Sequence, residues 1–263
     1  MKSFFRRAGL LLLALPLQAF ADSNSVVNLS HYDLVRPDFA AMRADGTRAI
    51  IHEASYPRSI RDEYYASRQE AAVRAGMLWG AYHFANSDDP IRQADHFLNT
   101  VQSAWREASP SERPSEVLLV LDFEKNNHYP GKTMTPAQAV AFAQHVRART
   151  GRYPGLYSNE HRIQAVLGSG QLTAAQKEVI RSCWLWVANY HYPPRSIAPW
   201  SEWTLWQYTG DGVCDLPRAS YPKRAGNIKN AERNIFRGST GGLATFWRTH
   251  GWRVGGGGGG EAE

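Results

Sequence analysis

Two carboxylates spaced two residues apart, Asp122 and Glu124, are the side chains of this sequence best suited to acid–base chemistry. They close an apolar run, Val117 to Leu121, whose length and uniformity are typical of a strand buried on both faces. Side chains two apart on a strand lie on the same side, about 7 Å apart along the chain, so the two acids should project together. Burying carboxylates costs free energy unless they are paired or used, which favours a functional site over a solvated strand end.

Alternating strands and helices are expected to position these acids. Before the acid-bearing strand, strands are predicted at 26–30, 48–54 and 77–84, and helices at 37–44, 61–75 and 90–105. After it come a helix opened by Thr135 and closed by Gly151, a strand at 155–158, a helix opened by Thr173, and strands at 183–189 and 203–208. This alternation predicts a parallel sheet with crossover helices.

The last two predicted strands are joined by an irregular segment containing prolines, without a helical pattern. This indicates a fold that departs from the eightfold repeat of strand and helix found in regular (β/α) barrels. We therefore predict one α/β domain, an irregular (β/α) barrel of the TIM type with fewer helices than strands. An open doubly wound sheet is the alternative, although no Gly-rich dinucleotide fingerprint follows the first strand.

The carboxyl ends of the strands in a parallel barrel meet at one face. That face would gather the acid pair with polar and aromatic side chains from other strand ends: Asn28, Glu53, Tyr82, Phe84, Tyr157, Trp186, Asn189, Trp206 and Tyr208. Carboxylates among aromatic walls suit glycoside hydrolysis. One acid protonates the leaving oxygen, and a second carboxylate stabilises positive charge at the sugar carbon.

Motifs for other chemistry are missing from the sequence. There is no HExxH, CxxC or EF-hand pattern, so neither a metal nor another cofactor is expected. The lack of a GxSxG elbow argues against an esterase. No block of Lys and Arg stands out, which argues against binding to nucleic acid.

Residues 1–21 are typical of a signal peptide. Met1 to Arg7 is basic, Ala8 to Leu17 is apolar but too short to span a bilayer, and Ala19 to Ala21 fits a cleavage site. We expect a periplasmic or secreted monomer with no integral membrane segment in the mature chain. Cleavage would lower the formal net charge from +6 to +3, which suits an anionic partner such as a cell wall.

The expected export also bears on the rest of the mature chain. Residues 22–252 should form the folded domain, and residues 253–263 a flexible Gly-rich tail that cannot pack a core. In an exported protein, a disulfide between Cys183 and Cys214 is one expectation. Two free thiols are the alternative, because the sequence does not give the separation of the two Cα atoms.

Seven short motifs follow one another along the expected mature chain. They are Asn28-Leu29-Ser30-His31-Tyr32, Gly80-Ala81-Tyr82-His83-Phe84-Ala85, Gln93-Ala94-Asp95-His96-Phe97, Leu121-Asp122-Phe123-Glu124, Trp186-Val187-Ala188, Trp203-Thr204-Leu205-Trp206-Gln207-Tyr208 and Ala231-Glu232-Arg233-Asn234-Ile235-Phe236. In this order they resemble the motifs of the family 25 glycoside hydrolases, the Chalaropsis-type lysozymes.

The resemblance implies an N-acetylmuramidase that cuts the β-1,4 bond between N-acetylmuramic acid and N-acetylglucosamine in peptidoglycan. It also implies an irregular barrel with fewer helices than strands. Glu124 would be the general acid and then the base, while the acetamido group of the substrate acts as the nucleophile. Asp122 would orient and stabilise that group.

Three positions depart from the family pattern. Asn28 and Glu232 each stand where the family has an aspartate. The family's Lys-x-x-Glu motif on the second strand is missing, and His52 and Ser55 lie near that place in the sequence instead. Glu53 could supply the charge that Asn28 lacks. These departures leave open a non-catalytic peptidoglycan-binding protein on the same fold. A chitin-type hexosaminidase, which also uses an Asp-x-Glu pair, is a further alternative.

Overall fold

The computed structural model describes residues 21–167 and 170–256. Apart from Ala21, the expected signal peptide lies outside the described residues, and so do residues 257–263 of the expected tail. Val254, inside the range expected for the tail, is buried against the main apolar core. Within the described residues, no helix is both long enough and apolar enough to cross a membrane.

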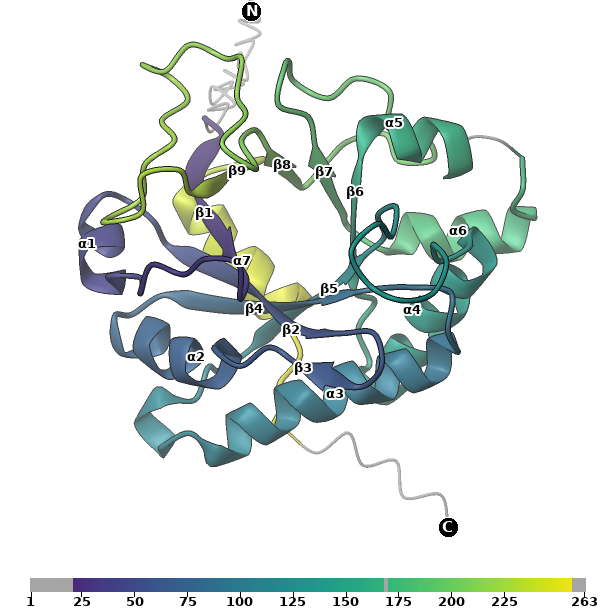
Figure 1. Ribbon diagram of the computed structural model, residues 1–263, viewed down its shortest axis with the longest axis horizontal. Coiled ribbons are helices and arrows are strands. Elements are labelled where there is room, and N and C mark those ends of the chain that lie inside the picture. The colour runs from purple at the N-terminus through teal and green to yellow at the C-terminus, as the bar shows by residue number, and fades with distance from the viewer. Residues whose placement is uncertain (1–20, 168–169, 257–263) are drawn as a thin grey trace, which may run out of the picture.

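Eight strands close into a barrel, which confirms the predicted fold class and excludes the open sheet (Figure 1). In barrel order they are β1 (Ser23–Leu29), β2 (Ala49–Tyr56), β4 (Leu78–Phe84), β5 (Val117–Asp122), β6 (Gly155–Asn159), β7 (Leu185–Ala188), β8 (Leu205–Gln207) and β9 (Glu232–Phe236). Neighbours from β1 through β8 run parallel, and β9 runs antiparallel to both β8 and β1. The two-residue strand β3 (Ile60–Arg61) forms a hairpin with β2 outside the barrel.

The helices cover the outside of the barrel, as crossover connections do in parallel sheets. They are α1 (Phe39–Ala44), α2 (Tyr65–Arg74), α3 (Pro90–Glu107), α4 (Pro136–Thr150), α5 (Glu160–Arg162) and α6 (Ala174–Ser182). The capping boxes at Thr135 and Thr173 are both formed, and Gly151 ends α4 at a φ of 73°. As predicted, the described chain passes from β7 to β8 without a helix.

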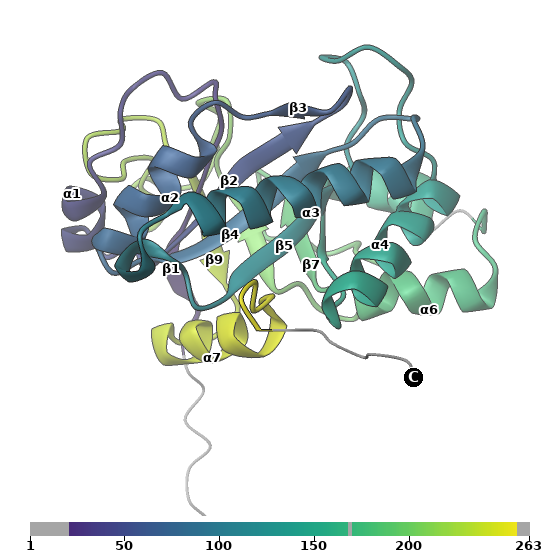
Figure 2. The same cartoon turned by 90° about the horizontal axis from the view of Figure 1, so that it is seen from below.

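Helix α7 (Thr240–His250) was not predicted from the sequence. Its first turn contains Gly241 and Gly242, which weaken the helical signal, although Ser239 caps it by accepting a hydrogen bond from the Gly242 amide. The helix lies across the amino-terminal end of the barrel (Figure 2). There Trp247 is buried and its indole N–H donates to the carbonyl oxygen of Trp79 at 2.8 Å.

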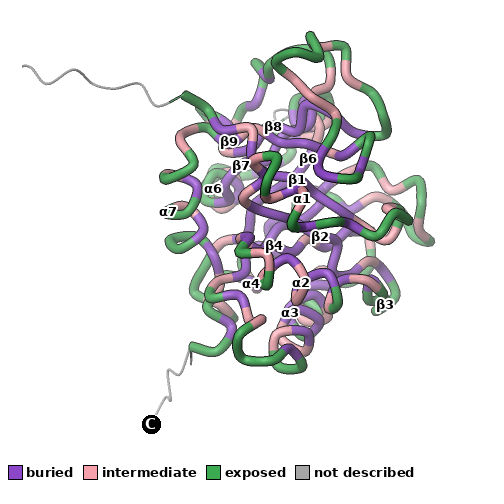
Figure 3. Tube along the Cα trace, turned by 90° about the vertical axis from the view of Figure 1, so that its left-hand side faces the viewer, coloured by how far each residue is buried: buried purple, intermediate pink, exposed green. Residues whose placement is uncertain are grey.

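Burial alternates along the strands because successive side chains point to opposite faces. One of the two cores is an apolar cluster that includes Val26, Leu118, Leu205 and Trp247. A larger cluster packs the helices against the other face of the sheet. Figure 3 shows the strands as buried and the connecting loops as largely exposed. The inward positions at the carboxyl ends therefore become the walls of any site there.

The expected disulfide is wrong, because Cys183 and Cys214 are both free thiols in the structure. Cys183 follows α6, and its buried thiol donates to the carbonyl oxygen of Val179 in that same helix, 3.6 Å away. Cys214 lies in the long segment between β8 and β9 and is partly buried.

Candidate active site

A cleft of about 590 Å³ lies at the carboxyl ends of the barrel strands. It is lined by nine of the candidate site residues named from the sequence: Asn28, Glu53, Tyr82, Phe84, Asp122, Glu124, Tyr157, Trp186 and Glu232. Because β9 runs against its neighbours, its first residue, Glu232, lies level with Asn28 near the end of β1. The antiparallel strand therefore brings a late acid to the same face as the early strands.

The other three predicted residues lie elsewhere. Asn189 lines an adjoining cavity of about 480 Å³, which shares Glu124, Tyr190 and Asp211 with the cleft. Trp206 and Tyr208 were predicted in the cleft, but this is wrong, since both belong to the core between sheet and helices. Their polar groups bond there, the Trp206 indole to the Asn189 carbonyl at 2.8 Å and the Tyr208 hydroxyl to the Pro222 carbonyl at 2.6 Å.

Residue alternation explains this error. Gln207 and Leu205 occupy the inward positions of β8, so Trp206, between them, points outward. The inward Gln207 is a site residue that the sequence reasoning missed, although it lies inside the quoted Trp-Thr-Leu-Trp-Gln-Tyr motif. A strict two-residue period applied to that motif would have selected it.

Asp122 and Glu124 both face the cleft, as their spacing predicted. Asp122 is 6% exposed, and its Oδ1 atom has no hydrogen-bond partner among the described residues. Burial raises the pKa of Asp122 well above its usual range, and the nearby charge of Glu124 raises it further. Burial also raises the pKa of Glu124, while a hydrogen bond with Asn159 opposes that effect. The pair can therefore hold a proton nearer neutral pH than ordinary carboxyls do.

Asn28 and Glu232, the two departures from the family pattern, contact each other directly. The Asn28 amide donates to Glu232 Oε2. Gln207 donates to the same oxygen at 3.1 Å and to Asn28 Oδ1 at 3.2 Å. An aspartate at position 28 would instead bring two carboxylates together, which requires one of them to carry a proton. Asparagine at this position therefore matches glutamate at position 232.

The same network fixes two aromatic walls of the cleft. Asn234 donates to Asn28 Oδ1 at 2.9 Å and accepts from the indole N–H of Trp186 at 2.7 Å. The Tyr157 hydroxyl donates to Gln207 Oε1, and its ring lies 4.5 Å from that of Trp186 between centroids. One hydrogen bond to each side chain and the contact between the two rings therefore hold both walls in place without a ligand.

A family model described as "Glycosyl hydrolases family 25" matches residues 27–215, which include the acid pair and most of the barrel. The chain belongs to this family. The protein is therefore a glycoside hydrolase, which confirms the predicted family and enzyme class.

Among known proteins, the chain is 25% identical to "Lysozyme M1" of Streptomyces globisporus over 234 residues, which cover 83% of this chain and 70% of that protein. It is 24% identical to an "N,O-diacetylmuramidase" of Arthroderma benhamiae over 176 residues, 65% of this chain and 70% of that protein. A bacterial lysozyme from Streptomyces coelicolor has a similar structure, with a TM-score of 0.66 and 21% identity over 88% of this chain and 99% of the other. This structural similarity supports a barrel fold common to the two proteins.

Several side chains of this family 25 enzyme line the cleft without having been predicted. They come mainly from loops, whose paths the sequence does not reveal. Tyr190 follows β7, Asp211 follows β8, and Asp33 and Tyr129 follow β1 and β5. Asp211 contributes negative charge that raises the pKa of Glu124.

Glu53 is supported by an ion-pair cluster in which the two acids are buried and His31 is partly exposed. The His31 Nδ1 atom lies 2.7 Å from Glu53 Oε2 and 3.5 Å from Asp62 Oδ2. These three ligand atoms lie within 4.8 Å of one another, so they are the group in the described chain that could hold a metal. Two ligands of one tetrahedral zinc ion lie about 3.3 Å apart, given bonds of about 2.0–2.1 Å. The shorter His31–Glu53 separation fits a hydrogen bond and a role in holding Glu53 in place.

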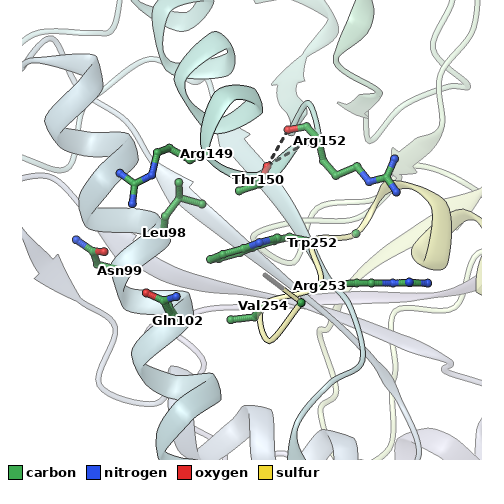
Figure 4. Close-up of a pocket in the computed structure, with 11 residues that line it drawn as sticks. Leu98, Asn99, Gln102, Arg149, Thr150, Arg152, Trp252, Arg253 and Val254 are labelled. Atoms are coloured by element: carbon green, nitrogen blue, oxygen red, sulfur yellow. Dashed lines mark hydrogen bonds between the residues drawn. The ribbon is translucent and has the colours of Figure 1, made fainter. Parts of the chain in front are cut away.

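A further cavity, of about 490 Å³, lies at the other end of the barrel (Figure 4). It is bounded by α3, the end of α4 and the segment after α7, with Trp252 flanked by Arg149, Arg152 and Arg253. Its described lining carries no carboxylate, so it cannot supply the acid that glycoside hydrolysis needs.

Replacing Glu232 with glutamine should change how stability depends on pH. Burial is the main cause that raises the pKa of Glu232 from 4.5 to about 7. The folded enzyme therefore holds this proton more tightly than the unfolded chain, so its stabilising effect is full below pH 4.5 and is lost as pH rises through 7. Glu232→Gln should raise the free energy of unfolding at pH 8, by up to about 3 kcal/mol, and have little effect at pH 4.

Urea unfolding of both proteins at pH 4 and pH 8 measures this difference. Glu178→Gln is the control, because Glu178 is exposed on α6 and pairs with Arg181, three residues away. An equal change at the two pH values for Glu232→Gln would contradict the prediction.

Proposed function

We propose that this family 25 glycoside hydrolase is a muramidase, which cleaves the β-1,4 bond between N-acetylmuramic acid and N-acetylglucosamine in peptidoglycan. The observation that carries the proposal is the acid pair: Asp122 and Glu124 leave one strand together and both face the cleft. The names of the similar proteins, a lysozyme and a diacetylmuramidase, agree with this substrate.

Glu124 is the proposed general acid. It is only partly buried, at the junction of the two adjoining cavities, so a sugar on either side can reach it. Its raised pKa keeps a proton available for the glycosidic oxygen. As that oxygen takes the proton, its bond to the sugar C1 carbon breaks.

The acetamido group of the substrate is the proposed nucleophile. Its carbonyl oxygen forms a bond to C1 as the leaving oxygen departs, which gives an oxazolinium ion. Asp122 accepts the acetamido N–H, and its unpartnered Oδ1 atom is free for this bond. Water then attacks C1, Glu124 takes the proton from that water, and the bond between C1 and the acetamido oxygen breaks. Two displacements at C1 retain its configuration.

The spacing of the acids supports this route over a carboxylate nucleophile. Two acids from one strand approach the same side of the sugar. A retaining enzyme that forms a covalent intermediate needs its nucleophile on the face opposite to the acid, which more naturally comes from another strand.

The deciding experiment for the proposed function is digestion of purified peptidoglycan. The products are reduced with borohydride, and the reduced sugars are identified. A muramidase gives muramitol, whereas cleavage of the other bond gives glucosaminitol. Activity on chitin oligomers alone would select the hexosaminidase reading, and binding without new reducing ends would select the non-catalytic one.

We also propose that the enzyme is exported by cleavage after Ala21 and acts as a monomer. The basic and apolar segments before that residue support the first statement. Residues 22–252 would then form the catalytic domain, with residues 253–263 as a tail. Amino-terminal sequencing of the exported protein, which should begin at Asp22, and its sedimentation test the two statements separately.

A further inference from the structure

Phe123, the residue between the two acids, has its backbone held on both sides. Its N–H donates to the carbonyl oxygen of Tyr157 at 2.8 Å. Its carbonyl oxygen accepts from the Ser158 hydroxyl at 2.9 Å and from Arg162 Nε at 3.0 Å. Since Phe123 links Asp122 to Glu124, fixing its peptide groups fixes the directions in which both acids project.

Arg162 reaches this point from α5, which follows β6 directly. Its second contact is a hydrogen bond from Nη2 to the carbonyl oxygen of Met134, 3.1 Å away. Its guanidinium carbon also lies 4.2 Å from the centre of the buried Phe123 ring, a distance typical of a cation–π contact. Three contacts therefore fix the position of this side chain against Phe123, the residue between the two acids.

The charges around the acids are mainly negative. Glu53 from β2 and Glu232 from β9 act on Asp122, and Asp211 from the loop after β8 acts on Glu124. His128, from the loop after β5, acts on Glu124 in the opposite sense. Arg162 is a cation that acts on both acids and lowers the pKa of each.

We propose that Arg162 is a positioning residue for the acid pair, which aims both carboxyls through the Phe123 carbonyl and limits how much negative charge they face. The proposal rests on the proposed role of Glu124 as general acid. It adds to that role a residue that does not touch the sugar and lies outside the seven motifs.

Two substitutions separate the two actions of Arg162. Arg162→Lys keeps the charge but cannot reproduce the planar pair of donors to Phe123 and Met134. It should lower kcat by about tenfold, within the range that small misplacements of catalytic groups cost, and leave the pH profile in place. Arg162→Met keeps apolar contact with the Phe123 ring but removes the charge. It should lower kcat and also move both limbs of the kcat/KM profile toward higher pH.

The matched control is Arg147→Met. Arg147 also stacks on an aromatic ring, that of Tyr153 at 5.0 Å, but it lies on α4 and outside the lining of the cleft. The control should change neither kcat nor the pH profile. Thermal unfolding of all four proteins shows whether each variant is folded at the assay temperature.

The carbon-13 chemical shifts of the Asp122 and Glu124 carboxyls, titrated by NMR, provide a second readout that needs no turnover. Both titrations should move to higher pH in Arg162→Met and stay in place in Arg162→Lys. Unchanged titrations and an unchanged profile in Arg162→Met would overturn the proposal, even if kcat falls. If the wild-type enzyme releases no sugar from peptidoglycan, the proposed function fails, and the carboxyl titrations still decide the role of Arg162.

Discussion

Glu124→Gln should lower kcat for peptidoglycan hydrolysis by about 10²–10⁴-fold and leave KM nearly unchanged, because general acid catalysis contributes rate enhancements of this size. Glutamine keeps the shape of the side chain and can still bond to Asn159. It cannot protonate the leaving oxygen or later take a proton from water. Binding of intact glycan, which depends on the walls of the cleft, should therefore survive.

The release of reducing ends and the retention of the variant on insoluble peptidoglycan measure these two quantities. Glu178→Gln on α6 serves again as the control for the substitution itself, since its carboxylate is exposed and distant in sequence from the acid pair. Activity of Glu124→Gln within threefold of wild type would show that another group is the acid.

Asp122→Asn should lower kcat by about 10²–10³-fold, the cost typical of removing one group that stabilises charge in a transition state. An asparagine can still accept the acetamido N–H, but it carries no negative charge to stabilise the oxazolinium ion. The charge of Glu124 raises the pKa of Asp122. Because repulsion between two charges is mutual, loss of the Asp122 charge should make ionisation of Glu124 easier. The basic limb of the pH profile should therefore move to lower pH.

Added azide distinguishes the two possible roles of Asp122. If Asp122 were the nucleophile, azide could take its place in the variant and restore turnover, with an inverted glycosyl azide as the product. With the substrate acetamido group as nucleophile, azide should not restore activity. A glycosyl–aspartate adduct trapped on the wild-type enzyme would also contradict the proposed route.

The sequence predicted the acid pair and the barrel for physical reasons that hold locally. A uniform apolar run can only be a buried strand or a buried helix segment, and five short strands alternating with helices favour a parallel sheet. The two-residue period then places Asp122 and Glu124 on one side. No long-range information is needed for either step.

Other features depend on contacts between distant segments. Trp206 and Tyr208 are aromatic and lie near a strand end. Which face of β8 points into the barrel decides that they pack in the core outside it and not in the cleft. The antiparallel direction of β9 is set by its pairing with β1 and β8. In the sequence, Asn28 and Glu232 are two separate departures from the family pattern, and their mutual hydrogen bond shows that they form one unit.

The alternative of a non-catalytic binding protein can be weighed on the same contacts. A binding protein has no need of a buried carboxyl pair, whose desolvation costs free energy. This protein nevertheless has such a pair, together with the hydrogen-bond network that joins Asn28, Gln207 and Glu232. This arrangement supports the hydrolase, in agreement with the family to which the chain belongs.

The position of β9 between β1 and β8 has a consequence for how the enzyme is made. Asn28 and Glu232 are 204 residues apart in sequence, yet they share one wall of the cleft. A chain that is still being synthesised, or is threading through a membrane pore from its amino terminus, has an open barrel until its last strand emerges. We therefore expect the ability to cut glycan to arise late and abruptly, after nearly the whole chain is free to fold. A lytic enzyme would in this way remain harmless during its own production.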